Sequence, residues 1–294
     1  MTEPDGLDVG IVAHRSRDLL RACLESLRTY APARPLRIVV VDNDSGDGTV
    51  EMVRAFPGVE LIEAGANVGF SAATNRAIAR GGAPYFLALN PDTQVRAGTL
   101  DALLDLMDAD PSIGICGCRL EREDGTFDHA AKRSFPTPLG ALAHFTGVGG
   151  RAGAPAKLAQ YRAPRVERGP VDAVSGAFML IRRSALEEVG NFDEGYWLYM
   201  EDLDLCYRFV RAGWIVWYEP SVAVTHVKGG SSGRSRTLRV NRAFHYGMYR
   251  FYRQHYASSR SPVVNLVVYA AIAGKLVVSA TRSAVDRRLM RRAG

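Results

Sequence analysis

Carboxylate and amide side chains follow two of the apolar runs near the start of this chain. One run leads into Asp42 and Asn43 within "VVVDNDSGDGT", and another leads into Asn90 and Asp92 within "LNPDT". A carboxylate in such a place can accept hydrogen bonds from a base N–H or a ribose hydroxyl, and its oxygen suits a hard cation such as Mg²⁺ or Mn²⁺. Ordinary turns and helix caps use the same residue types, so each turn alone is weak evidence of a site.

Two later segments add acids, aromatic residues and an imidazole. Glu201 and Asp202 begin a helical pattern a few residues after Trp197, in "YWLYMEDLDLCYRFVRAGW". Acids at a helix start can simply complement its dipole. This segment exceeds what capping requires, since it has three acids beside three aromatic residues, namely Glu201, Asp202 and Asp204 beside Tyr196, Trp197 and Tyr199. His226 ends an apolar run and Lys228 follows in a Gly- and Ser-rich loop, so an imidazole and an ammonium would be available to a phosphate. A histidine at a strand end is more often structural.

An alternation of strands and helices must position these residues. The expected strands in the first 120 residues are Val9–Ala13, Arg37–Asp42, Val59–Glu63, Tyr85–Asn90 and Ile113–Leu120. Apolar residues recur at helical spacing in Arg17–Tyr30, which predicts a helix that covers one face of the sheet. This order is typical of an α/β fold with a mostly parallel sheet, in which ligands bind beyond the carboxyl ends of the strands.

The second half of the chain is less regular. Residues 121–170 are rich in Gly, Pro, Ala and charge, which predicts a long loop-rich insertion. Order returns in four further elements, namely a strand over Val171–Arg183, a helix over Leu203–Ala212 and strands over Trp214–Tyr218 and Val222–His226.

The charge is concentrated at the C-terminus. Residues 228–294 hold 14 of the 37 Lys and Arg residues and a single acid, Asp286, for a net charge of +13, while the rest of the chain carries −7. A basic tail on an acidic body favours contact with an anionic surface, either lipid headgroups or nucleic acid. A solvated charged face is the alternative.

Within this tail, Val263–Ala280 is long and apolar enough to be considered as a membrane span, since about 20 such residues cross the hydrocarbon core. Asn265 and Lys275 interrupt it, and arginines flank both of its ends. One-sided positive charge would orient a spanning helix, so the two-sided pattern favours a helix that lies in the headgroup region. A helix packed on the rest of the protein is the alternative. The polar start of the chain shows no secretory signal, which predicts a cytoplasmic protein.

Two common nucleotide-binding motifs are absent. The first strand is followed by "HRSRD" without G-x-G-x-x-G, and no G-x-x-x-x-G-K-[ST] loop occurs in the chain. A nucleotidyltransferase stays open as an alternative, although such enzymes more often have a Gly-rich basic loop after the first strand. A nucleic-acid-binding protein would use the basic tail, but neither class explains the ordered polar residues at the strand ends.

Taken together, these residues resemble glycosyltransferase family 2, and within it the rhamnosyltransferase-like branch. The resemblance covers about residues 8–232 and rests on ordered segments: "VVVDNDSGDGT", "NVGFSAATNRAI", "LNPDT", "SGAFMLIRRSALEEVGNFDE", "YMEDLDLCYRFVRAGW" and the closing His226. It implies an inverting enzyme with a GT-A fold, meaning a Rossmann-like, mostly parallel sheet flanked by helices, here with a C-terminal helical extension.

The resemblance also implies a donor site and a metal site. A nucleotide diphosphate sugar is the implied donor, and Asp42 is expected to face its base. The other residues expected at the donor are Asn43, Asn67, Gly69, Asn75 and Asn90. Asp92 and His226 match metal ligands of the family, with Mn²⁺ or Mg²⁺ as the ion. Asn90 stands where the family pattern has a first carboxylate, so it is expected to contact sugar or ribose instead.

Asp202 matches the base that inversion requires, which removes the proton of the acceptor hydroxyl opposite the leaving diphosphate. Glu201 points about 100° away on the same helix, so the two acids are not expected to reach the same proton. Glu201, Trp197 and Lys228 are expected on the acceptor side.

The expected reaction is transfer of L-rhamnose from dTDP-rhamnose to a lipid-linked or polysaccharide acceptor in cell-envelope glycan synthesis. A uridine diphosphate donor of galactofuranose or N-acetylglucosamine is the alternative. We expect a catalytic domain over residues 1–232, with residues 121–170 on its acceptor side. We expect residues 233–294 to associate with the inner face of the cell membrane, and no nucleic acid partner.

Overall fold

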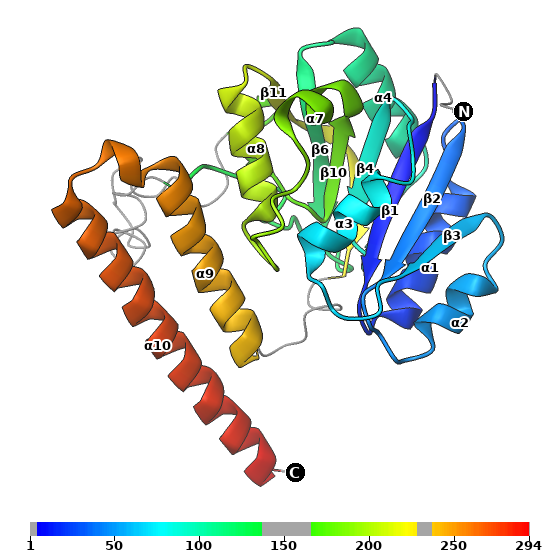
Figure 1. The fold of residues 1–294 in the computed structure, drawn as a ribbon. Helices are drawn as coiled ribbons and strands as arrows, with labels where there is room; N and C mark the ends of the chain where they lie inside the picture. The colour runs from blue at the N-terminus through cyan, green and yellow to red at the C-terminus, as the bar shows by residue number, and fades with distance from the viewer. Residues whose placement is uncertain (1–4, 137–165, 228–236, 294) are drawn as a thin grey trace.

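The computed structural model describes residues 5–136, 166–227 and 237–293. Its central sheet has the strand order β3-β2-β1-β4-β10-β6-β11-β5 (Figure 1). The strands are β1 (Leu7–Ala13), β2 (Leu36–Asp42), β3 (Val59–Glu63), β4 (Tyr85–Leu89), β5 (Thr93–Gln94), β6 (Ile113–Glu121), β10 (Phe178–Arg182) and β11 (Ile215–His226). A short strand, β8 (Gly169–Pro170), pairs with β11, and β7 (Lys132–Arg133) pairs separately with β9 (Ala173–Val174).

Strands β1 to β4 are mutually parallel, and β10 inserts antiparallel between β4 and β6. All seven residues of β1 are buried, as a strand covered on both faces requires. Ala13 is paired with Asp42, so β1 and β2 end at the same edge of the sheet. The mixed, mostly parallel sheet confirms the expected fold class.

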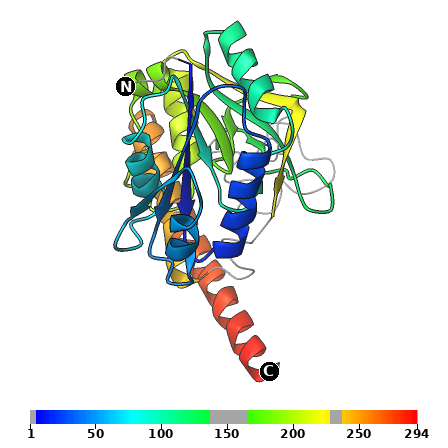
Figure 2. The same cartoon turned by 90° about the vertical axis from the view of Figure 1, so that its right-hand side faces the viewer.

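Helices cover both faces of the sheet. They are α1 (Arg17–Thr29), α2 (Thr49–Arg54), α3 (Phe70–Ile78), α4 (Thr99–Ala109), α7 (Arg183–Val189) and α8 (Glu201–Arg211). Figure 2 shows α3 and α8 on one face, and α1 and α4 on the other. The residues of α1 that recur at helical spacing, Leu20, Cys23, Leu24 and Leu27, are buried against the sheet, as the pattern predicted.

The C-terminal extension is a helical hairpin beside the sheet domain (Figure 1). Helices α9 (Leu238–His255) and α10 (Pro262–Ala293) run antiparallel, joined by a 3-10 turn at Ala257–Ser259. Helix α9 is anchored on the body, because Arg250 forms an ion pair of 2.8 Å with Asp193 and His255 Nε2 forms a hydrogen bond of 2.7 Å with Asp204. The expected domain boundary at residues 232 and 233 lies outside the described residues.

The structure corrects three element boundaries. The apolar stretch Val171–Arg183 is two strands, because Phe178 N–H donates to the Ser175 carbonyl and turns the chain between β9 and β10. The two strands expected around Pro220 are the single strand β11. The missing N–H of Pro220 is accommodated by a shift in register against β6 instead of a chain break. Helix α8 begins at Glu201, two residues before the expected Leu203.

Candidate active site

The carboxyl ends of β1 and β2 form one side of the site. Asp42 is only 5% exposed, and its Oδ2 accepts a hydrogen bond of 3.3 Å from the Ser45 N–H. Its Oδ1 is buried and has no hydrogen-bond partner among the residues that the structure describes. A buried carboxylate oxygen left unpaired is costly, so this atom is suited to accept a hydrogen bond from a ligand.

Asn43 holds the connection between β3 and α3 in place. Its Oδ1 accepts from the Val68 N–H at 2.9 Å, and its Nδ2 donates to the Gly69 carbonyl at 3.2 Å and to Asn67 Oδ1 at 3.4 Å. The Asn67 side chain in turn accepts from the Gly69 N–H at 3.2 Å. Residues 67–69, which we call the donor loop, are therefore fixed relative to the end of β2.

Gly69 allows the donor loop to approach the segment before α8. Its φ of +93° lies in the region that favours glycine, and a Cβ there would stand 2.4 Å from the Trp197 carbonyl oxygen. The Phe70 N–H donates to that same carbonyl at 2.7 Å. The backbone of Trp197 therefore packs directly against Gly69. Trp197 was expected on the acceptor side, so the structure places an expected acceptor-side residue next to the expected donor loop.

Replacing Gly69 with Ala should destabilise the protein by about 2–4 kcal/mol, because the new Cβ would combine backbone strain with a collision against rigid backbone. Gly65→Ala is the matched control. Gly65 also has a positive φ (+76°) between β3 and α3, but nothing lies within 4 Å of its Cβ position, so its cost should be about 1 kcal/mol. Chemical denaturation of both variants measures the difference, and equal losses would contradict this account.

Asn75 of α3 braces the chain that leads to Trp197. Its Nδ2 donates to the Phe192 carbonyl at 2.9 Å and to Glu194 Oε1 at 3.0 Å, and its Oδ1 accepts from the Phe192 N–H at 3.2 Å. Both the amide nitrogen and the amide oxygen of Asn75 are therefore hydrogen-bonded within the protein. Its expected place beside a nucleotide stays a prediction.

Asp92 and His226 come together at the opposite side of the site. The β11–β5 pairing sets His226 opposite Thr93, which brings His226 Nε2 to 3.5 Å from Asp92 Oδ1. Both side chains are largely buried, and the other imidazole nitrogen, Nδ1, lies 3.3 Å from Asp128 Oδ2. Burial alone would lower the pKa of His226, but hydrogen bonds to Asp128 and Asp92 raise it to about 9.

Asp128 was not expected from the sequence. It lies in the segment after β6 with a fully buried side chain, and nothing in "REDGTFDHA" separates it from the neighbouring turn acids. A carboxylate on the far nitrogen of a metal-binding histidine fixes which nitrogen faces the ion. Across the described ranges no cluster of three or more His, Cys, Asp or Glu side chains could hold a metal by itself. An ion between Asp92 and His226 would need further ligands from substrate or water.

Asp202 is held at the start of α8 by groups from two other segments. Its Oδ1 accepts from the Leu203 N–H at 2.7 Å, and its Oδ2 accepts from the Gly176 N–H at 3.0 Å. Arg133 of β7 forms an ion pair with the same Oδ2. Arg133, in the expected loop-rich insertion, was also missed by the sequence reasoning, because its role depends on the β7–β9 pairing.

Glu201 is a buried acid next to Asp202. It is 6% exposed, and its Oε2 has no hydrogen-bond partner in the described part of the chain. Burial first, and then the nearby Asp202, raise the pKa of Glu201 to about 8. The raised pKa favours the neutral form of Glu201, so Asp202 is the candidate proton acceptor of the pair.

One short segment connects the two halves of the site. Ala177 accepts hydrogen bonds from the Asn90 N–H at 3.0 Å and from Thr93 Oγ1 at 3.2 Å, while the preceding Gly176 donates to Asp202. The turn between β4 and β5, which carries Asp92, and the Asp202 carboxylate are thus linked through two consecutive residues. Lys228 lies outside the described residues.

Comparisons with known proteins identify the family of this chain. A model described as "Glycosyl transferase family 2" matches residues 8–190. An N-acetylglucosaminyl-diphospho-decaprenol L-rhamnosyltransferase of Mycobacterium tuberculosis is 36% identical over 244 residues, 78% of each chain. Rhamnosyltransferase WbbL of Escherichia coli is 27% identical over 224 residues, covering 74% of this chain and 81% of that one.

Among solved structures, the mannosyltransferase PcManGT from Pyrobaculum calidifontis, in complex with GDP-Man and Mn²⁺, superposes with a TM-score of 0.60 at 16% identity, covering 100% of this chain and 78% of that chain. This likeness concerns the fold, which is the GT-A fold. The family model matches more than half of this chain, and the alignment with the M. tuberculosis rhamnosyltransferase covers more than two thirds of it. This chain belongs to glycosyl transferase family 2 and is a glycosyltransferase.

Proposed function

We propose that this glycosyltransferase transfers L-rhamnose from dTDP-rhamnose to a lipid-linked sugar acceptor of the cell envelope, with inversion at the anomeric carbon. The relatives support the sugar and the acceptor class, since one is a rhamnosyltransferase named for a diphospho-decaprenol acceptor and another is a rhamnosyltransferase. The observation that carries the proposal is the short Gly176–Ala177 segment, which brings the Asp202 carboxylate close to the turn that carries Asp92.

In the proposed reaction the acceptor hydroxyl attacks the anomeric carbon opposite the diphosphate. Asp202 takes the hydroxyl proton, and the electron pair of the breaking C–O bond leaves with the nucleotide diphosphate. Gly176 and Arg133 hold Asp202 in one orientation, which spares the cost of ordering it at each turnover. The unpaired Oδ1 of Asp42 is suited to a hydrogen bond from the nucleotide.

The side chains of Asp92 and His226, expected beside the donor diphosphate, fit a divalent ion. Asp92 offers a carboxylate oxygen and His226 an imidazole nitrogen, a combination that suits Mn²⁺ and, less well, Mg²⁺. Such an ion supplies positive charge to the departing diphosphate, so no acid is needed on that side. Because the pKa of His226 is about 9 without an ion, an ion would have to displace the Nε2 proton, while Asp128 would keep the proton on Nδ1.

Replacing Asp128 with Asn should weaken Mn²⁺-dependent binding of dTDP about 10-fold or more, because it removes the charge that orients His226. Asp124→Asn is the matched control. Asp124 lies four residues earlier, is exposed, and bonds only within its own turn, to Thr126. Calorimetric titration of dTDP with and without Mn²⁺ measures the change, and equal affinities for the two variants would remove Asp128 from the metal site.

The donor is tested by thermal unfolding with dTDP, UDP and GDP in the presence of Mn²⁺, followed by transfer from dTDP-rhamnose to an N-acetylglucosaminyl diphosphate lipid. A ligand that binds only the folded state stabilises it by mass action, so we expect dTDP to give the largest shift. Selective stabilisation by UDP, with transfer of galactofuranose or N-acetylglucosamine, would replace rhamnose in this proposal.

The C-terminal hairpin supports association with the cytoplasmic face of the membrane. Pro262–Thr281 of α10 is long and apolar enough to cross a membrane by length and composition, with a mean hydropathy of 1.9, and only 6% of it is buried. We infer that this helix lies in the headgroup region, because basic residues precede and follow it in the sequence.

Introducing charge on α10 should separate the protein from anionic vesicles. Leu266 and Val277 are 69% and 64% exposed, so Leu266→Glu with Val277→Glu should leave the fold intact and lower vesicle binding about 10-fold or more. Val210→Glu, at a 40% exposed apolar residue of α8, is the control. Cosedimentation at low and high salt measures binding, and full binding by the double variant would assign the contact to another surface.

A further inference from the structure

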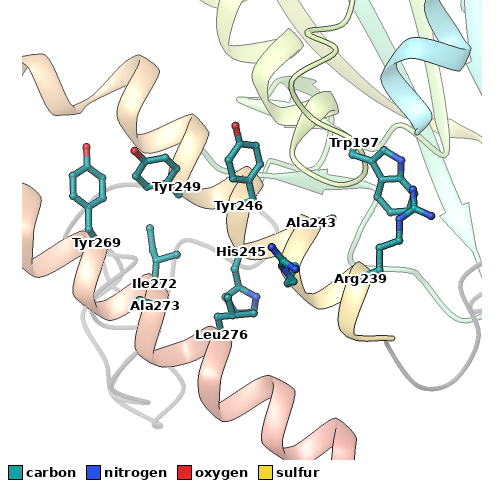
Figure 3. Close-up of a pocket in the computed structure, with 11 residues that line it drawn as sticks. Trp197, Arg239, Ala243, His245, Tyr246, Tyr249, Tyr269, Ile272, Ala273 and Leu276 are labelled. Carbon is teal, nitrogen blue, oxygen red and sulfur yellow. The ribbon is translucent and has the colours of Figure 1, made fainter. Parts of the chain in front are cut away.

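A cavity of about 520 Å³ lies between α9, α10 and Trp197 (Figure 3). Its volume is that of an ordinary ligand site. Arg239 stands at one end of it beside Trp197 (Figure 3), with Arg242 three residues further along α9, while Tyr249, Tyr269 and Ile272 line the other end. The cavity, which we call the hairpin groove, thus has a cationic end and an apolar, aromatic end.

The cationic end of the hairpin groove adjoins the candidate active site. The Arg239 guanidinium stacks over the Trp197 ring, 4.1 Å from its centroid, and donates to the Asn67 carbonyl at 3.4 Å. Trp197 Nε1 also donates to the Asn67 carbonyl of the donor loop at 3.4 Å, and the Trp197 carbonyl accepts from the Phe70 N–H that follows the loop. Trp197 therefore contacts both the donor loop and the positive end of the groove.

The apolar end of the hairpin groove is preformed by contacts between α9 and α10. Tyr249 of α9 and Tyr269 of α10 pack with ring centroids 5.1 Å apart. Hydrogen bonds tie the two helices on either side of the groove, from Tyr252 to Asn265 at 2.7 Å and between Asn241 and Ser279 at 3.0 Å. A preformed wall of this kind spares a ligand the cost of ordering it.

We propose that the hairpin groove binds the lipid of the acceptor, with the diphosphate at Arg239 and Arg242 and the isoprenoid chain along the aromatic end. The inference rests on the proposed function. Charge complementarity favours this occupant, since its anionic diphosphate would pair with the arginines at one end of the groove. Its hydrocarbon chain would then lie along the apolar end. The exposed apolar side of α10, with Leu266 at 69% exposure, then lets the remainder of the chain stay in the bilayer.

The test compares two acceptors that carry the same sugar diphosphate, one on a long polyisoprenyl chain and one on a chain of two isoprene units. Ala273 lines the groove on an exposed part of α10, so Ala273→Trp fills the apolar end without disturbing the core. We expect kcat/KM for the long-chain acceptor to fall on the order of 10-fold, as for the loss of two or three methylene contacts, with little change for the short one.

Two further variants complete the test. Ala270→Trp adds the same side chain to an exposed residue of α10 that does not line the groove, and should leave both rates unchanged. Arg242→Gln, at an exposed residue whose change leaves the core intact, should raise KM about 10-fold for both acceptors, because both share the diphosphate. Measurements in detergent remove any contribution from vesicle binding.

An unchanged preference for the long chain in Ala273→Trp would overturn the inference. So would a change in sedimentation of that variant without a change in chain preference, because the groove would then bind a second copy of the chain. If the unsubstituted enzyme binds dTDP-rhamnose but transfers to neither acceptor, the proposed function itself fails. The two failures are therefore distinguishable.

Discussion

Replacing Asp202 with Asn should lower sugar transfer by a factor on the order of 10² to 10⁴ while leaving donor binding nearly intact. The amide keeps the size of the side chain and can still accept from the Gly176 N–H, but it cannot take a proton from the acceptor. The loss should therefore appear in kcat. Initial rates with dTDP-rhamnose and a lipid-linked acceptor, beside calorimetric donor affinity, separate the two effects.

Glu201→Gln is the informative comparison, since it changes the adjacent acid of the same helix turn. Burial and the neighbouring Asp202 raise the pKa of Glu201 to about 8, which favours the neutral carboxyl that Gln resembles. We expect a loss well below 10-fold, confined to the KM of the acceptor if Glu201 contacts it. Transfer by Asp202→Asn at the parent rate, or a larger loss in Glu201→Gln, would move the base assignment from Asp202.

The fold class followed from residue patterns because apolar runs and helical spacing report burial directly. Strands β1 to β4 and helix α1 were predicted to within a few residues for this reason. The break at Ser175 was not, since a uniformly apolar stretch does not reveal where a strand changes partners. The continuity of β11 across Pro220 depends on the neighbouring β6, which local sequence cannot show.

The site divides in the same way. Asp92 and His226 were predicted as site residues because polar residues after apolar strands mark the edge of the sheet where ligands bind, while the role predicted for Asp202, at a helix start, came from the family resemblance. Asp128 and Arg133 were missed because they reach the site only through pairings of short segments that carry no periodic signal. The contact of Arg239 with Trp197 likewise depends on tertiary packing of α9. These partners orient groups that the sequence could identify by type.

The metal site gives the second large expected effect. Asp92→Ala should lower Mn²⁺-dependent binding of dTDP by more than about 100-fold, since loss of an orienting partner alone costs 10- to 100-fold. His226→Ala should act in the same direction, because the two side chains lie 3.5 Å apart and would share one ion. Chelation of divalent ions should abolish transfer by the unsubstituted enzyme. Calorimetric titration of dTDP at fixed Mn²⁺ measures the binding losses.

Removing either ligand also removes part of a buried network, so a loss of folding must be separated from a loss of metal. Asp92 and Asp128 are both nearly inaccessible, and His226 lies between them. Asp105→Ala, at an aspartate whose side chain is 74% exposed on α4, controls for the loss of a carboxylate elsewhere. If the metal assignment is right, Asp92→Ala and the parent should bind dTDP equally weakly in chelator and differ only when Mn²⁺ is added. Only a shared ion makes the effect of the substitution depend on the metal. Full activity of the parent enzyme in chelator would therefore assign Asp92 and His226 a purely structural role. The same would follow if Asp92→Ala lost equal affinity for dTDP with and without Mn²⁺.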